Sequence, residues 1–122
     1  MIEYTVQVHN NRTEWLNKDE ELHRIDGPAI EWNHGDKSWY INGLRHREDG
    51  PACEYINGIK EWYQNGRRHR EDGPAYEYPG IKQWFIEGEE LTEDEFNQRN
   101  SVKEMTVADI EALLGHSVKI VK

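Results

Sequence analysis

The chain is poor in cysteine and has no long apolar run. Cys53 is the only cysteine among 122 residues, which excludes an intrachain disulfide and a cysteine-based zinc cluster. No stretch reaches the ~18 consecutive apolar residues that a membrane helix needs. Residues 1–4 show no basic region followed by an apolar run. These absences predict a cytoplasmic chain without a membrane span or a secretion signal.

Positive charge is also scarce. The sequence carries 15 lysines and arginines against 24 acids, which gives a formal net charge of -9. Acids exceed bases in residues 1–22 and 89–122, whereas residues 23–88 are nearly balanced. Because an acidic surface repels phosphate backbones and anionic lipids, we expect no direct binding to nucleic acid or to membranes. The same charge favours a protein partner with a basic surface.

One phrase of seven residues is present three times. It reads His-Arg-x-Asp-Gly-Pro-Ala and begins at His23, His46 and His69, so the period is 23 residues. A fixed period of this size is typical of repeat proteins, in which each unit buries its apolar face against its neighbours. We expect one domain with a degenerate N-terminal hairpin that caps the sheet in residues 1–22, three repeats in 23–88, and a C-terminal α/β cap in 89–122.

Each repeat is predicted to be a β-hairpin. Two aromatic-rich runs flank Asn57 and Gly58, a pair that suits a type I′ turn. A two-residue turn places Cys53 opposite Trp62, and a similar turn at residues 34–35 places Ile30 opposite Trp39. These residues form a tryptophan face. The reverse face is expected to be wetter and carries Ala29, Glu31, Ser38 and Tyr40 in the first unit, and Ala52, Glu54, Glu61 and Tyr63 in the second.

The ends of the chain depart from the repeat. The third unit is one residue shorter between Glu77 and Ile81, which predicts an irregular hairpin that keeps its place in the sheet. Residues 4–9 and 12–17 are expected to pair. Thr92 with Glu95 is a capping box that opens a helix to about residue 99. A second helix from Thr106 and a strand at 118–121 complete the cap. The predicted fold is mainly β, an antiparallel hairpin meander of about eight strands with a small helix-helix-strand end.

The repeat resembles the MORN repeat, especially its bacterial variants, over roughly residues 13–90. The phrases that carry the likeness are Gly58-x-x-x-Trp62-x-x-x-Gly66-x-x-His69 and Trp39-Tyr40-x-Asn42-Gly43-x-x-His46. The pattern departs from MORN where Arg24, Arg47 and Arg70 follow the histidine. With residues 105–115, the arrangement is similar to small proteins common in bacteriophage genomes. The resemblance implies an open β-meander that serves as an interaction scaffold, with lipid binding proposed for some members.

The His-Arg-x-Asp segments invite a catalytic interpretation, because histidine is a natural acid/base. A catalytic site is normally singular, however, and kinase chemistry would require Asp directly after Arg. Neighbouring units of two strands lie about 10 Å apart, too far for three histidines to share one metal ion. We expect no catalytic residue, metal or cofactor. The segments are predicted to be structural turns in which Asp accepts backbone N–H groups, Arg pairs with Asp or a neighbouring unit, and His packs: His23, Asp26, His46, Asp49, His69 and Asp72.

Acidic and aromatic residues recur on the reverse face and at the C-terminal end. The ordinary interpretation is a solvated sheet surface with cross-strand tyrosine packing. The functional one is a platform for a basic protein, since tyrosine supplies rigid contact area and carboxylates steer association. The candidate partner-binding residues are Glu31, Tyr40, Glu54, Tyr63, Glu77, Phe85, Glu89, Glu90, Glu93 and Asp94, with Glu95 beside them.

Three functions follow as hypotheses. The leading one is a non-enzymatic, phage-encoded protein that binds and inhibits a host protein such as a CRISPR-type defence nuclease. The alternative is a small-ligand or nucleotide-binding protein in which Arg24, Arg47 and Arg70 hold phosphates with turn amides. The third, a membrane-associated scaffold, rests on the MORN resemblance alone. The sheet edges and the tryptophan face also favour a homodimer.

Overall fold

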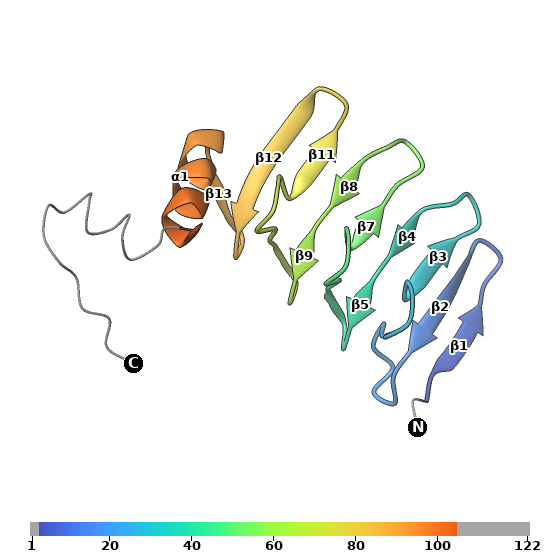
Figure 1. The fold of residues 1–122 in the computed structure, drawn as a ribbon. Coiled ribbons are helices and arrows are strands. Elements are labelled where there is room, and N and C mark those ends of the chain that lie inside the picture. The colour runs from blue at the N-terminus through green and yellow to red at the C-terminus, as the bar shows by residue number, and fades with distance from the viewer. Residues whose placement is uncertain (1–2, 105–122) are drawn as a thin grey trace, which may run out of the picture.

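The computed structural model describes residues 3–104 and is mainly β. A nine-stranded antiparallel sheet forms a row of hairpins from the N-terminus to a single helix, α1 (Glu93–Glu104) (Figure 1). The predicted class and the antiparallel hairpin meander are confirmed. The predicted second helix from Thr106 and the strand at 118–121 lie outside the described residues.

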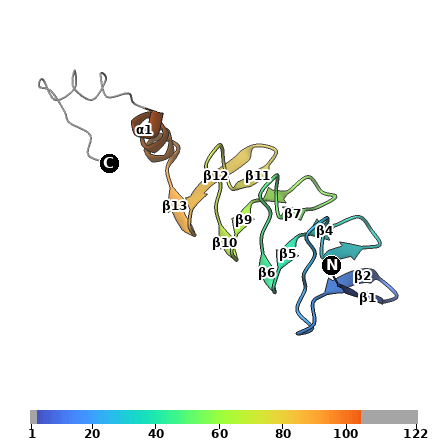
Figure 2. The same ribbon diagram turned by 60° about the horizontal axis from the view of Figure 1, so that its bottom comes forward.

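The described residues contain more strands than the sequence predicts, because each unit forms two hairpins rather than one. The main sheet consists, in this order, of β1 (Thr5–Val8), β2 (Arg12–Leu16), β3 (Ile30–Trp32), β4 (Lys37–Ser38), β7 (Cys53–Glu54), β8 (Lys60–Glu61), β11 (Tyr76–Tyr78), β12 (Ile81–Ile86) and β13 (Glu89–Leu91). Two further hairpins pair β5 (Tyr40–Ile41) with β6 (Leu44–Arg45), and β9 (Tyr63–Gln64) with β10 (Arg67–Arg68). These short hairpins and the end of β12–β13 lie side by side beneath the main sheet in Figure 2.

The two hairpins of a unit turn differently. At the short hairpin, Asn65 and Gly66 have φ of 50° and 81°, which is the type I′ pattern expected of this pair. At the main sheet, the Tyr55 N–H donates to the Ile59 carbonyl and the Gly58 N–H donates to the Tyr55 carbonyl. This closes a three-residue loop in which only Gly58 has positive φ. The predicted type I′ turn at residues 57–58 is therefore wrong.

The longer loop shifts the register by one residue. Cys53 pairs with Glu61 rather than Trp62, and Ile30 pairs with Ser38 rather than Trp39. Since successive side chains point to opposite faces, the predicted faces are wrong as well. The alanines of the repeated phrase show this error, because Ala29 and Ala52 were expected on the wetter face. Ala29, Ala52 and Ala75 are all fully buried.

The alanine position lies at the contact between consecutive units. The carbonyls of Ala29, Ala52 and Ala75 accept hydrogen bonds of 2.8, 2.7 and 2.8 Å from the N–H groups of Trp15, Trp39 and Trp62. Each bond joins a unit to the one before it. Ala52 also belongs to a small buried cluster with Cys53 and Tyr63. The core is thin, and it runs along the row of units.

The third unit keeps its place in the sheet, as predicted, but its hairpin is regular. Tyr78 pairs with Ile81 across Pro79 and Gly80, where only Gly80 has positive φ. A Pro-Gly pair of this kind suits a type II turn. Its two-residue loop replaces the three-residue loop of the other units and absorbs the deletion. Strand β12 is six residues long and continuous into the second hairpin.

The two ends of the described chain differ. At the N-terminal end, β1 and β2 form the predicted hairpin, and β1 is an exposed edge strand. At the other end, Thr92 and Glu95 form the predicted capping box with reciprocal bonds of 3.0 and 3.1 Å. Phe96 of α1 is buried and its ring lies 6.5 Å from that of Trp84 in β12. The helix therefore packs on the last hairpin, and it extends five residues beyond the predicted end at about residue 99.

The buried thiol and the tyrosines packed around it predict that the free energy of unfolding falls at alkaline pH. Burial raises the pKa of the Cys53 thiol from 9.0, and burial also raises the pKa values of Tyr55 and Tyr63. Below about pH 9 the thiol is neutral in both the folded and the unfolded chain, so stability is unaffected. Above about pH 9, the thiol ionises in the unfolded chain before it ionises in the folded one, so the free energy of unfolding falls. We expect Cys53→Ala to cost about 1 kcal/mol at pH 7 and to flatten this decline.

Urea denaturation of wild type and Cys53→Ala at about pH 7, 9 and 10.5 measures the effect. A decline remains in the variant because Tyr55 and Tyr63 still titrate. Equal slopes of unfolding free energy against pH in the two proteins would contradict the prediction.

Candidate interaction groove

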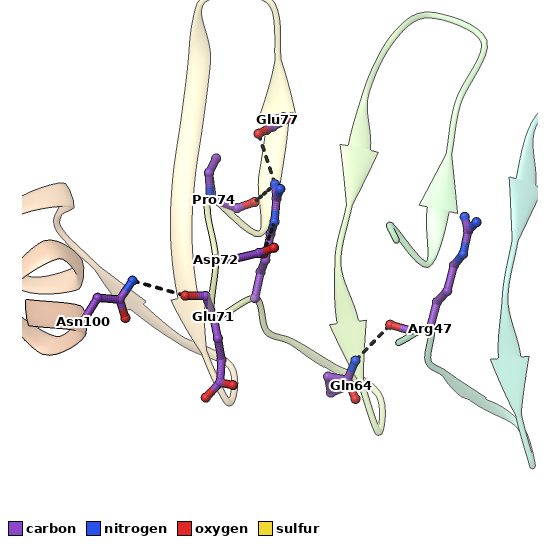
Figure 3. A network of polar contacts seen from close by, with 8 residues as sticks. Arg47, Gln64, Glu71, Asp72, Pro74, Glu77 and Asn100 are labelled. Atoms are coloured by element: carbon purple, nitrogen blue, oxygen red, sulfur yellow. Dashed lines mark hydrogen bonds and ion pairs between the residues drawn. The ribbon is translucent and has the colours of Figure 1, made fainter. Parts of the chain in front are cut away.

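Each repeated segment holds its arginine against the tryptophan of the preceding stretch of chain. The Arg47 guanidinium lies 3.8 Å from the centroid of the Trp39 ring. Its Nε donates to Asp49 at 3.0 Å, and one terminal nitrogen donates to the Pro51 carbonyl at 3.0 Å and to Glu54 at 2.8 Å. The third unit repeats these contacts between Arg70 and Trp62, Asp72, Pro74 and Glu77, the last three of which converge in Figure 3.

The glycine of the segment makes room for the arginine. A Cβ at Gly27, Gly50 or Gly73 would lie 2.9, 3.0 or 2.9 Å from the guanidinium carbon of Arg24, Arg47 or Arg70. Arg24 makes the same stack on Trp15, at 4.1 Å, and the same bond to Asp26. We call this arrangement of tryptophan, arginine, aspartate and glycine the arginine clamp. The predicted Arg–Asp pairing is confirmed, whereas the aspartates bind the arginine and not the expected backbone N–H groups in the described part of the chain.

The histidines join the repeated segment of a unit to the short hairpin of the same unit. The Nδ1 atoms of His23, His46 and His69 accept bonds of 2.9, 3.1 and 3.0 Å from the N–H groups of Asn42, Asn65 and Glu87. These donors are the first residues of the next type I′ turns. An accepting Nδ1 carries no proton, so each ring is the neutral tautomer with its hydrogen on Nε2. Packing alone was expected here. The available signal was the near-constant spacing of 19, 19 and 18 residues from histidine to turn.

A groove of about 1110 Å³ lies between the second and third segments. Its walls come from both segments and from the short hairpin β9–β10, where the Gln64 side chain donates to the Arg47 carbonyl (Figure 3). The lining residues are Arg47, Glu48, Asp49, Gly50, Trp62, Gln64, Asn65, Arg67, His69, Arg70, Glu71, Asp72 and Glu87.

The exposed charge of this groove is mainly acidic. The side chains of Glu48, Asp49 and Asp72 are 83, 87 and 85 % exposed, whereas those of Arg47 and Arg70 are only 20 and 21 % exposed. The clamps use both guanidinium groups internally. Arg67 is the exposed cation among the lining residues. The groove is therefore suited to a cationic ligand, because its carboxylates face solvent and most of its arginine charge is already paired.

The predicted acidic-aromatic platform does not form on the sheet. Glu31, Glu54 and Glu77 are cross-strand partners of Lys37, Lys60 and Lys82, so acids and bases alternate across the strands. Cross-strand partners share a face, and the lysines counter the acidic stripe.

The aromatic residues of the predicted platform are packed against their own sheet. Tyr63 is only 9 % exposed and its hydroxyl donates to Glu61 at 2.8 Å. Tyr40 and Phe85 are half-buried beside Arg45 and Arg68, at 5.8 and 5.3 Å from ring centroid to guanidinium carbon. These rings are packing residues. They offer little contact area to a partner.

The C-terminal acids remain candidates. Glu89, Glu90, Glu93 and Asp94 are exposed, and Glu90 and Glu93 border a smaller hollow of about 370 Å³ beside Trp84. Glu95 caps α1, and hydrogen bonds to Thr92 lower the pKa of its carboxyl. Sequence reasoning missed Glu48, Glu71 and Glu87 as groove residues. The signal for Glu48 and Glu71 was the acid at the variable position of the repeated phrase, whereas Glu87 lies in a turn outside that phrase.

Two other kinds of site are missing from the part of the chain that the structure describes. Within residues 3–104, no three His, Cys, Asp or Glu side chains are placed to hold a metal ion. No helix in the same range has the length and apolar character to cross a membrane. Comparison with protein-family models, with curated proteins and with solved structures finds no match to this chain.

The clamp predicts that arginine and lysine are not interchangeable at position 47. Arg47→Lys loses the ring stack and the Nε bond to Asp49, because an ammonium group has no planar fork. We expect a loss of about 2 kcal/mol in unfolding free energy, the scale of hydrogen bonds to charged groups. Arg67→Lys, on an exposed side chain in the same groove, is the matched control and should change stability by less than about 0.5 kcal/mol. Equal losses measured by urea denaturation would contradict a specific clamp.

Proposed function

We propose that this chain is a non-enzymatic protein-interaction module that binds a basic segment of a partner in the groove between its second and third units. The observation that carries the proposal is the division of charge in that groove. Its arginines are paired within the clamps, while Glu48, Asp49 and Asp72 are exposed. A lysine or arginine entering the groove meets Glu48 and also the exposed side chains of Asp49 and Asp72, each of which contacts its clamp arginine through Oδ1. The net charge of -9 steers a cation there.

The partner we propose is a host protein with a basic surface, such as a defence nuclease of the CRISPR type. Nucleic-acid channels are lined by lysine and arginine, and a small acidic protein is suited to block one. The resemblance to bacteriophage proteins and to MORN repeats supports this setting, and the regular row of hairpins is in keeping with an interaction scaffold.

The nucleotide-binding alternative is less well supported. Arg24, Arg47 and Arg70 would have to give up aspartate and proline carbonyl partners to hold a phosphate. The exposed carboxylates around Arg47 and Arg70 would repel the anion. The membrane-scaffold alternative meets the same acidic charge. No observation favours either one over a basic protein partner.

The groove proposal is tested with a fluorescein-labelled arginine-rich nonapeptide and the full chain. We expect binding that weakens between about 50 and 300 mM salt, because screening reduces exposed ion pairs. The Glu48→Gln/Glu87→Gln variant should bind about tenfold more weakly, if each lost ion pair contributes up to about 1 kcal/mol. Fluorescence anisotropy measures both effects.

Two control variants remove the same charge elsewhere. Glu3→Gln/Glu20→Gln changes exposed acids near the N-terminal hairpin and should have little effect. Glu90→Gln/Glu93→Gln tests the C-terminal acids. A tenfold loss in that variant with none in Glu48→Gln/Glu87→Gln would move the site to the C-terminal end and contradict the groove proposal.

The homodimer also stays a proposal, and β1 is the edge at which we place it. This strand carries no charge, and Val6 and Val8 are 50 and 78 % exposed. At the opposite end, α1 packs on β12 and β13. Light scattering at about 100 µM should give a dimer mass that Val8→Lys reduces to the monomer and Ile56→Lys, on a loop, does not. A wild-type monomer at that concentration would contradict the dimer.

A further inference from the structure

The first unit carries apolar residues where the second unit carries groove residues. One period of 23 residues before Glu48, Gln64 and Arg67, which all line the groove, the chain has Ile25, Ile41 and Leu44. The other lining positions keep their residue type one period earlier, as with Trp39 before Trp62 and Arg24 before Arg47, except that Gln64 precedes Glu87. The repeat therefore places apolar residues at the positions of the first unit that correspond to groove residues of the second.

Two of these apolar side chains, those of Ile25 and Leu44, are exposed, whereas Ile41 is half-buried. Ile25 is 60 % exposed, although its backbone N–H donates to the Tyr4 hydroxyl at 2.8 Å. Leu44 is 51 % exposed, and its Cδ2 would lie 3.3 Å from a Cβ at Gly66, the turn glycine of the next hairpin. Exposed apolar residues at neighbouring positions of a fold are typical of a binding surface.

The flanking charge indicates what kind of partner fits. Asp26 follows Ile25 directly and Glu48 comes four residues after Leu44, and their side chains are 71 and 83 % exposed. A purely apolar partner would leave these carboxylates desolvated without a counter-charge. A segment that combines an apolar side chain with lysine or arginine satisfies both halves of the surface.

We propose that one extended partner segment binds along the first unit and into the groove, with an apolar side chain on Ile25 and Leu44 and a basic side chain at Glu48 and Asp49. This rests on the proposed function and names the chemistry of its partner. Adjacent units are two strands, or about 10 Å, apart. Because an extended chain advances about 3.3 Å per residue, the apolar and basic residues of the partner are three positions apart.

The test uses two labelled nonapeptides that differ at one position. The first contains leucine three residues before an arginine in an otherwise serine- and arginine-containing sequence, and the second has serine in place of that leucine. We expect wild-type protein to bind the leucine peptide about tenfold more tightly than the serine peptide, because partial burial of one aliphatic side chain gives a gain of this size. A third peptide with the leucine moved next to the arginine should lose the gain.

Protein variants then locate the leucine. Ile25→Ser/Leu44→Ser should bind both peptides with the affinity that wild type has for the serine peptide. Leu44→Arg, which gives the first unit the residue found one period later, should also remove the preference and guards against a folding defect. Ile56→Ser/Ile81→Ser changes exposed apolar residues of the main-sheet loops, 67 and 49 % exposed, and should keep the preference.

The outcomes separate this inference from the proposed function. Equal affinity of wild type for the leucine and serine peptides, or a preference that survives Ile25→Ser/Leu44→Ser, would overturn the inference while the basic-segment function stands. Failure of every peptide to bind at low salt would overturn both. Self-association of wild type that Leu44→Arg abolishes would assign the apolar surface to a second copy of the chain and would also overturn the inference.

Discussion

The fold depends on how each unit neutralises and covers one arginine. A guanidinium group is costly to bury unless its donors are satisfied and its charge is paired. Arg47 meets this requirement with three hydrogen-bond acceptors, which are the carboxylates of Asp49 and Glu54 and the carbonyl of Pro51. Its guanidinium group is covered by the ring of Trp39, which comes earlier in the chain. The arginine thereby ties two hairpins and a connecting segment together. Among the described residues, only small ones such as Ala52 and Cys53 are fully buried. The sheet therefore has little hydrophobic core that could hold neighbouring hairpins together.

That constraint accounts for the repeated phrase residue by residue. Arginine is required for the stack and the forked hydrogen bonds, and aspartate two positions later holds its Nε. Glycine follows because a Cβ would strike the guanidinium group, and alanine stands at a fully buried position. Histidine holds the turn of the short hairpin in the same unit. The phrase that suggested an active site is a set of packing and pairing requirements, and only the variable position is not fixed by them.

Local signals were sufficient for some predictions and insufficient for others. The capping box of Thr92 and Glu95 is local, and the structure has it. Asn57 and Gly58 suit two turn lengths equally well, and the wrong choice displaced every cross-strand partner by one residue. The alternation of Glu31, Glu54 and Glu77 with lysines depends on that register. The groove forms only when two units lie side by side. The acidic residues could therefore be read from the sequence, but their meeting in one groove could not.

The junctions between units are chemically alike, and this has a consequence for how the chain can change in length. The carbonyls of Leu22, Arg45 and Arg68 each accept a bond of 2.8 Å from the turn glycine of the following unit, and those of Ala29, Ala52 and Ala75 each accept a bond from the preceding tryptophan N–H. A duplicated unit would meet the same partners on both sides as the unit it copies. Stability in such an array grows with the number of nearest-neighbour junctions. A change in length by whole periods therefore keeps every junction intact, whereas an insertion of any other length breaks one.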